Sequence, residues 1–158
     1  MNLKISLRPA EEKDCRLLWK WRNEKSVRKV SFNSKYIPYK EHKKWFGEKL
    51  KDKNTKILII QDGSAKEIGE VKFDFDSKNK AEASIIIDKK ERGKGYGAKV
   101  LKLSSRCIFK NFPIKEIIAY VKRENIISFK TFRKAGFINT GLKEIKGFVC
   151  HEMILKND

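Results

Sequence analysis

Residues 85–101, IIIDKKERGKGYGAKVL, constrain this chain more than any other segment. Three isoleucines predict a buried strand, and Ala98 begins a stretch with the apolar spacing of a helix. Between them, Gly93, Gly95 and Gly97 allow the backbone to approach a ligand closely. Free N–H groups at the start of a helix bind phosphate, so this strand–loop–helix unit predicts a phosphate cradle.

The spacing of the three glycines excludes two common nucleotide-binding loops. A Walker loop needs Lys and then Ser or Thr directly after its last glycine, whereas Gly97 is followed by Ala98 and Lys99. The dinucleotide fingerprint G-x-G-x-x-G also fails, because these glycines are two residues apart and follow several strands. The pattern that remains is R-x-x-G-x-G, formed by Arg92, Gly95 and Gly97.

Apolar periodicity along the chain predicts one mixed α/β (α+β) domain over residues 1–158. The expected order is a strand, two helices, a three-strand meander, a helix, a strand, a helix and two strands. This order gives about seven mostly antiparallel strands and about four helices. The expected helices are 10–23, 40–52, 98–112 and 125–135, and the expected strands are 3–10, 56–60, 68–76, 81–88, 114–122 and the hairpin 137–155. Residues 26–39 are expected to be irregular.

Composition narrows the class of partner. The formal net charge is +18, which suits an anionic ligand, but the lysines are spread along the chain and favour a compositional origin over a nucleic-acid partner. No apolar run approaches the roughly 20 residues of a membrane helix, and the N-terminus lacks a signal-peptide core, so we expect a cytoplasmic protein. Cys15, Cys107 and Cys150 lack metal-ligand spacing, and no metal is expected. The sequence does not determine the oligomeric state, and a homodimer is possible.

Two segments together resemble the GCN5-related N-acetyltransferase (GNAT) family. The R-x-x-G-x-G loop is similar to that family's pyrophosphate loop for acetyl-coenzyme A (acetyl-CoA). Residues 125–137, NIISFKTFRKAGF, are similar to its segment in which an Asn starts a helix that ends in Gly-Phe. The resemblance covers essentially the whole chain and implies an acetyl-CoA-dependent N-acetyltransferase with the GNAT fold.

The resemblance also implies where the cofactor binds. Backbone N–H groups of residues 92–98 would hold the pyrophosphate, and the strand at residues 85–87 would pair with the pantetheine arm. Asn125 would bond that arm, cap its own helix, or do both. The implied cofactor residues are Ile85, Ile86, Ile87, Arg92, Gly93, Lys94, Gly95, Tyr96, Gly97, Ala98, Asn125 and Phe132.

Direct attack of an amine on a thioester requires an acid for the leaving thiolate. The family's usual acid is a Tyr four residues before the Gly-Phe pair, and this chain has Phe132 there. A phenyl ring cannot donate a proton. Either water protonates the leaving thiolate or another group does. Tyr120 is the candidate substitute, and a packed aromatic is the alternative role for it.

The attack also requires a base for the amine proton. Strand alternation places Glu82 with Ser84, and Glu70 with Asp74, each pair on one face of a strand. Glu82 is our first candidate for the base. Each of these polar side chains also fits the solvent-facing side of a half-buried strand.

The N-terminal half contains Trp21-Arg22-Asn23, Val27-Arg28, Ser31-Phe32-Asn33, Ile37, His42 and Trp45-Phe46. This series resembles a subgroup of the family found with bacterial nonulosonic-acid pathways. That resemblance implies a UDP-linked amino-dideoxy sugar as the acceptor, with basic groups on the diphosphate and aromatic rings stacked on the sugar or base. The implied substrate residues are Arg22, Asn23, Arg28, Phe32, Asn33, His42, Trp45 and Asp74. The aromatic members also fit core positions of amphipathic helices.

Two other classes of function stay open. One is an N-terminal α-amine acetyltransferase of the ribosomal-protein type, whose members also start with a Trp-rich helix. The other is a non-enzymatic module that binds an acyl-CoA or a nucleic acid.

Overall fold

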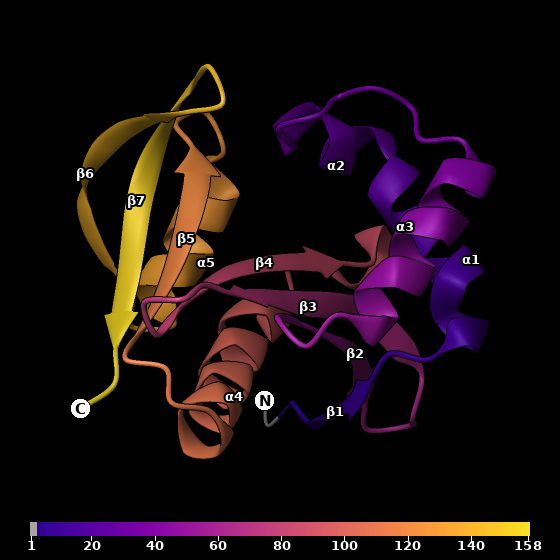
Figure 1. Ribbon diagram of the computed structural model, residues 1–158, viewed down its shortest axis with the longest axis horizontal. Helices are drawn as coiled ribbons and strands as arrows, with labels where there is room; N and C mark the ends of the chain where they lie inside the picture. The colour runs from indigo at the N-terminus through magenta and orange to yellow at the C-terminus, as the bar shows by residue number, and fades with distance from the viewer. Residues whose placement is uncertain (1–2) are drawn as a thin grey trace.

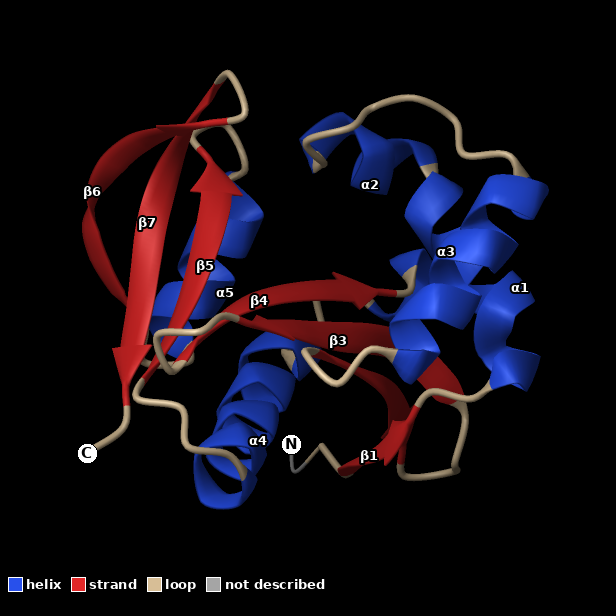
Figure 2. Ribbon diagram, viewed as in Figure 1, coloured by secondary structure: helices blue, strands red, loops and turns tan. Residues whose placement is uncertain are grey.

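Seven strands form one sheet in the computed structural model, which describes residues 3–158 (Figures 1 and 2). The strands are β1 (Ile5–Pro9), β2 (Thr55–Asp62), β3 (Glu67–Phe75), β4 (Lys80–Ile87), β5 (Glu116–Lys122), β6 (Ile138–Ile145) and β7 (Phe148–Lys156). Their order across the sheet is β1-β2-β3-β4-β5-β7-β6. Neighbours are antiparallel except for β4 and β5, which are parallel. The mixed, mostly antiparallel fold class expected from the sequence is confirmed.

Five helices cover the sheet, and two 3₁₀ turns, Glu12–Asp14 and Lys89–Glu91, precede α1 and the glycine loop. The helices are α1 (Cys15–Asn23), α2 (Lys25–Val30), α3 (Tyr39–Lys51), α4 (Tyr96–Asn111) and α5 (Ile126–Lys134). None of the helices within residues 3–158 is long and apolar enough to span a membrane.

Helix α2 corrects the expectation that residues 26–39 are irregular throughout. The Glu24 carboxylate accepts a hydrogen bond from the Val27 backbone N–H at 3.2 Å and caps the first turn. The helix has six residues and none of them is buried. Such a short helix shows no apolar periodicity, so the sequence pattern gave no signal for it.

The two faces of the sheet bury different cores, as strand alternation requires. Ile60, Val71 and Phe73 pack into the core that also takes α4 and α5. The neighbouring Ile59 points the other way, into a smaller core beneath α1 and α3. Figure 2 shows α4 lying under the sheet and α1 and α3 at its opposite side. The side chains of Glu70, Lys72 and Asp74 therefore share the α1–α3 face.

Helices α4 and α5 pack so closely that Gly97 has no room for a side chain. A Cβ at Gly97 would lie 2.8 Å from Cγ2 of Thr131 on α5. Gly97 is thus the contact that sets the spacing between the glycine loop and α5.

Replacing Gly97 with Ala should lower the free energy of unfolding by about 1–3 kcal/mol, the usual cost of overpacking. Urea denaturation measures it. Thr131→Ser removes Cγ2 and keeps the hydroxyl that donates to the Ile127 carbonyl at 2.9 Å. Gly97→Ala combined with Thr131→Ser should therefore recover most of the loss, and an equal loss in both variants would contradict this contact.

Candidate active site

The parallel pair β4–β5 separates after three positions. Lys80, Ala81 and Glu82 pair with residues 116–118 of β5, and no pairing continues beyond them. Residues 84–87 of β4 and 119–122 of β5 then enclose an opening, called here the strand gap. The gap leaves one edge of β4 without a strand partner among the described residues.

The backbone of β4 presents alternate peptide groups to the strand gap. A Cβ on Gly69 of β3 would collide with the Ile86 carbonyl oxygen, so that carbonyl faces β3. Because successive peptide groups alternate in direction, those of Ile85 and Ile87 face the gap. The Ile87 carbonyl accepts a hydrogen bond from Arg92 Nε at 2.9 Å. Ile85 keeps the free donor and acceptor that an extended ligand needs.

The glycine loop joins the end of β4 to the 16-residue helix α4. Gly93 and Gly95 have φ of 78° and 89°, in the left-handed region that favours glycine. Among residues 3–158, no backbone or side-chain oxygen accepts a hydrogen bond from the N–H groups of residues 92–95. Together with the first turn of α4, these N–H groups form a concave site suited to an anion.

Two basic side chains of the loop form ion pairs within the protein. Arg92 donates to Ser26 Oγ at 2.6 Å and to Glu24 Oε2 at 3.3 Å, which ties the loop to the start of α2. Lys94 Nζ lies 2.8 Å from Glu91 Oε2. The backbone N–H groups of the loop are therefore available to an anion, whereas the side chains of Arg92 and Lys94 are already paired.

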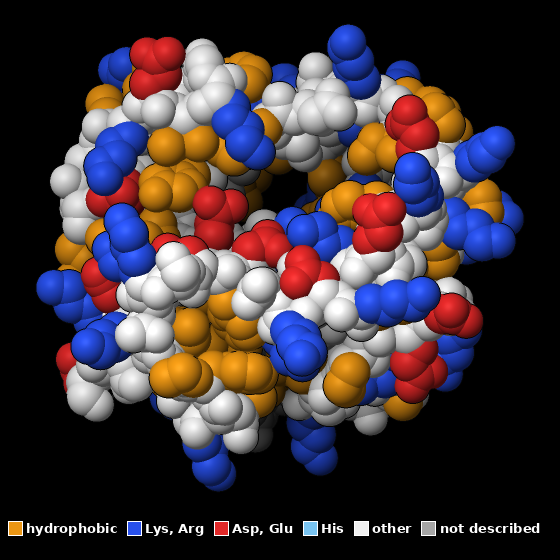
Figure 3. Space-filling view, in the orientation of Figure 1, with side chains coloured by type: hydrophobic (Ala, Val, Ile, Leu, Met, Phe, Trp, Pro, Cys, Tyr) orange, Lys and Arg blue, Asp and Glu red, His pale blue; other side chains and the backbone are white. Residues whose placement is uncertain are grey.

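An acidic cleft lies beside the strand gap, on the α1–α3 face of the sheet. It has a volume of about 250 Å³ and is bordered by Asp74, Phe75, Asp76, Lys80, Ala81, Glu82, Ile118 and Tyr120. Figure 3 shows acidic side chains along the floor of a hollow that divides this face of the molecule. Strand register explains the grouping, because Asp74 pairs with Glu82 and Glu82 pairs with Ile118.

Glu82 and Asp74, the two neighbouring carboxylates of the cleft, differ in their electrostatic surroundings. Glu82 has no ion-pair partner among residues 3–158, whereas Asp74 pairs with Lys72 at 3.1 Å. The surrounding protein withdraws the Glu82 carboxyl from bulk water, although part of it stays exposed, and this burial raises its pKa together with the charge of Asp74. Burial and the charge of Glu152 raise the pKa of Tyr120, which keeps the phenol protonated.

Comparison with known proteins assigns the family. Residues 4–138 match the model of the acetyltransferase (GNAT) domain. The chain belongs to the GNAT family of acetyltransferases. The expectation of an acetyl-CoA-dependent acetyltransferase is thereby confirmed at the level of the family.

Individual relatives in this family act on different amines. The chain is 24% identical over 152 residues to spermidine N(1)-acetyltransferase from Escherichia coli strain K12, covering 96% of this chain and 78% of that protein. The fold matches that of spermidine N-acetyltransferase from Vibrio cholerae in complex with CoA and spermine, with a TM-score of 0.87, 21% identity and coverage of 96% and 95%. It also matches an aminoglycoside acetyltransferase in complex with coenzyme A, with a TM-score of 0.85, 15% identity and coverage of 97% and 95%.

Three residues expected to bind substrate are engaged inside the protein. Arg22 pairs with the buried carboxylate of Glu70 at 2.5 Å, and its guanidinium lies 4.3 Å from the centre of the Trp45 ring. The Asn23 side chain accepts from the Ile37 backbone N–H at 2.8 Å and donates to its carbonyl at 2.9 Å. The Arg22 contacts join α1 to β3 and α3, and the Asn23 contacts join α1 to the segment before α3.

His42 corrects the expectation most clearly, because only 2% of it is exposed. Its ring stacks on Phe46 at 5.9 Å, and burial together with the charge of Arg22 lowers its pKa to about 4. A neutral, buried imidazole does not reach a substrate in the cleft. His42 is a core residue that follows the apolar face of α3.

Phe132 is also a core residue, with 3% of its surface exposed and an edge-to-face contact with Phe137 at 5.0 Å. The ring therefore packs in the core to which α4 and α5 contribute. The remaining expected substrate residues stay near the surface: Arg28 Nε donates to the Asn23 carbonyl at 3.0 Å, Asn33 Oδ1 accepts from the Lys35 backbone N–H at 3.1 Å, and Phe32 is half-buried.

Sequence reasoning missed the contribution of the β6–β7 hairpin. Phe148 lies 6.1 Å from Phe32, ring centre to ring centre, and Glu152 of β7 pairs in register with Tyr120. Alternation along β7 places Cys150, Glu152 and Ile154 on one face. That signal was present in the sequence, but it becomes useful only once β7 is known to lie beside β5.

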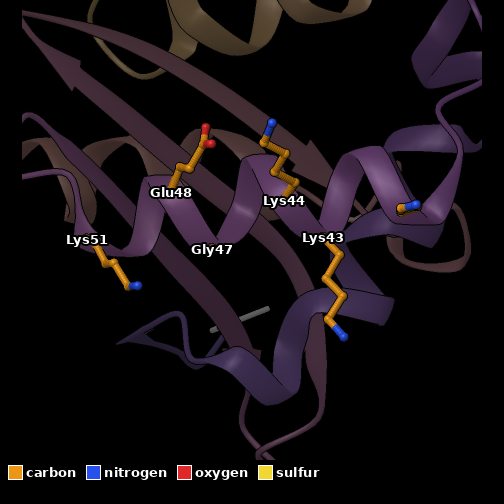
Figure 4. A pocket seen from close by; sticks show the side chains of 6 residues that line it. Lys43, Lys44, Gly47, Glu48 and Lys51 are labelled. Atoms are coloured by element: carbon orange, nitrogen blue, oxygen red, sulfur yellow. The ribbon is translucent and has the colours of Figure 1, made fainter.

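A second hollow lies on the outer surface of α3 and is a poor candidate for a catalytic site. It is bordered by Lys40, Lys43, Lys44, Gly47, Glu48 and Lys51, all from one helix (Figure 4). Figure 4 shows these side chains pointing in different directions rather than toward one point. Solvated lysines on one helix supply no pair of acid and base groups.

Arg22→Ala should lower the free energy of unfolding by about 3–5 kcal/mol, because it leaves the buried Glu70 carboxylate without a partner. Urea denaturation measures the loss. The control replaces both partners with apolar residues, Arg22→Met and Glu70→Leu, and should be more stable than Arg22→Ala. If the single and double variants are equally unstable, the pair does not hold α1 on the sheet.

Proposed function

We propose that this chain transfers the acetyl group of acetyl-CoA to a primary amine of a small polycationic acceptor, by direct attack in a ternary complex. The observation that carries the proposal is the position of Glu82. Its unpaired carboxylate lies in the acidic cleft, at the last residue of β4 that pairs with β5. The proposed base therefore lies where the pairing of β4 with β5 stops and the strand gap, part of the proposed donor site, begins.

The strand gap and the glycine loop suit the two parts of the donor. The Ile85 peptide group would pair with the pantetheine arm, and the N–H groups of residues 92–98 would hold the pyrophosphate. Asn125 Oδ1 caps α5 through the Ser128 N–H at 3.3 Å, which leaves its amide Nδ2 to donate to the same arm.

Each chemical requirement of acetyl transfer has a group in the chain. Acetyl-CoA, when bound, supplies an activated thioester. Glu82 accepts a proton from the acceptor's ammonium group, directly or through water, and the resulting neutral amine attacks the thioester carbon. The Ile85 N–H donates to the oxygen on which negative charge develops. Tyr120 donates a proton to the departing sulfur, the role that Phe132 cannot fill.

The charge of the cleft favours a cationic acceptor. Asp74, Asp76 and Glu82 border it, and the nearby Glu152 is saturated by Lys143 at 2.6 Å and Thr140 at 2.7 Å. Ammonium groups on an acceptor would replace water beside the first three carboxylates. The spermidine and aminoglycoside acetyltransferases that resemble this chain are named for acceptors of the same charge.

The UDP-linked amino sugar expected from the sequence receives less support. His42, Arg22 and Asn23, three of its expected contacts, are buried or engaged in internal contacts. A diphosphate would also enter a cleft in which carboxylates outnumber free cations. An α-amine at a protein N-terminus would enter the same acidic cleft. The comparison of acceptors described next also tests this alternative.

The test compares acceptors by thiol release from acetyl-CoA. Spermidine and an aminoglycoside should give higher kcat/KM than a UDP-linked amino sugar or an N-terminal peptide, and added salt should reduce their advantage. Glu82→Gln supplies the inactive control. A higher kcat/KM for the UDP-linked sugar would overturn the choice of acceptor.

The raised pKa of Glu82 predicts the pH dependence of the reaction. A base acts when it is deprotonated, so kcat/KM should fall as the pH drops through a midpoint above the ordinary value for a glutamate. Asp74→Asn removes the neighbouring negative charge and should move the midpoint to lower pH. Glu82→Gln should lower kcat by about 10²- to 10⁴-fold and abolish this limb. A midpoint unmoved in Asp74→Asn would contradict the assignment.

A further inference from the structure

The turn between β6 and β7 carries a lysine where its backbone favours another residue. Lys146 and Gly147 have φ of 51° and 85°. Two successive positive φ values define the two-residue hairpin turn that Asn-Gly forms most readily. A lysine is strained in this region, so the geometry of the turn does not account for its presence.

The Lys146 side chain extends from the turn toward the segment after α2. Its Nζ lies 5.4 Å from the centre of the Phe32 ring. Phe32 in turn lies 6.1 Å from Phe148. Figure 1 shows α2 and the β6–β7 turn facing each other at the upper end of the molecule. Lys146 and the two rings thus join the β6–β7 turn to the segment after α2.

The ammonium of Lys146 also acts on the proposed base. Its charge lowers the pKa of Glu82, as does that of Lys72, against the raising effects of burial and of Asp74. Tyr120 faces the same carboxylate from β5. Lys146 therefore lies near an aromatic ring, and its charge also reaches the carboxylate of Glu82 without forming an ion pair.

A second lysine, Lys122, lies against Phe148 and is more buried than Lys146. Lys122 is 4% exposed, its Nζ lies 3.6 Å from the centre of the Phe148 ring, and no carboxylate in residues 3–158 forms an ion pair with it. Lys146 is exposed. One cation is thus buried against Phe148, whereas the cation near Phe32 is accessible to solvent and to a competing ligand.

We propose that Lys146 is an internal stand-in for an ammonium group of the acceptor. An acceptor with two or more ammonium groups places one at Glu82 and another on the Phe32 ring, where it displaces Lys146. Phe32 and Lys146 would then set the specificity for polycations. This inference rests on the proposed function, since only a cationic acceptor competes for the position.

Lys146→Asn tests the inference without damaging the turn, because Asn-Gly suits its backbone. With spermidine as the acceptor, and at a pH well above the midpoint of Glu82, KM should fall about two- to fivefold, the effect of one exposed cation–π contact, with kcat unchanged. Phe32→Leu should raise KM instead. Lys102→Gln, on the exposed side of α4, removes the same charge elsewhere and should leave KM unchanged. Lys146→Arg should behave as the native chain does.

A rise in KM for Lys146→Asn, or an equal fall for Lys102→Gln, would overturn the inference. If the native chain acetylates no cationic amine, the proposed function has failed, and an NMR titration of the Glu82 carboxyl carbon decides the inference separately. Lys146→Asn should raise the pKa of Glu82. An unchanged pKa would show that the ammonium does not face this carboxylate.

Discussion

The separation of β4 from β5 is the constraint on which the rest of the site depends. Two neighbouring parallel strands normally share hydrogen bonds along their length, but these two share them at only three positions. Each is held by its other neighbour, since β3 pairs with residues 81–87 of β4 and β7 pairs with residues 116–122 of β5. The sheet can therefore open at its centre without losing its core.

The opening leaves polar backbone groups that a ligand can satisfy. Buried N–H and C=O groups without partners cost free energy, so an unpaired edge at the centre of a sheet has to be matched by water or by a ligand. Phe132 and Phe137 pack together in the core beneath the sheet, and a Cβ at Gly97 would collide with Thr131 where α4 meets α5. The glycine loop therefore begins a helix that is packed closely on α5.

Local charge and total charge differ in this protein. The chain has 38 Lys and Arg residues against 20 Asp and Glu residues, yet the cleft beside the gap is bordered by three carboxylates and one lysine. Strand register produces this grouping, because Asp74 and Glu82 are cross-strand neighbours on one face. The electrostatic preference of the site therefore follows from the sheet, and the net charge of the chain does not predict it.

Sequence reasoning predicted those parts of the protein that depend on local pattern. The spacing of Gly93, Gly95 and Gly97, followed by a helix, located the loop, and period-two alternation located most strands. It failed where a residue's role depends on distant contacts. His42 and Asn23 look like polar ligands in the sequence, but α1, α3 and the segment between them enclose both. The meeting of Phe32 with Phe148 is equally invisible, because 116 positions separate them and only the fold brings them together.

The central claim is that the strand gap and the glycine loop form the donor site, and amide hydrogen exchange tests it most directly. Adding CoA should slow exchange at Ile85 and across residues 93–97, with little change on the outer face of α3. The chain used should be the full-length protein at saturating CoA. Protection confined to other segments, or none at all, would contradict the account.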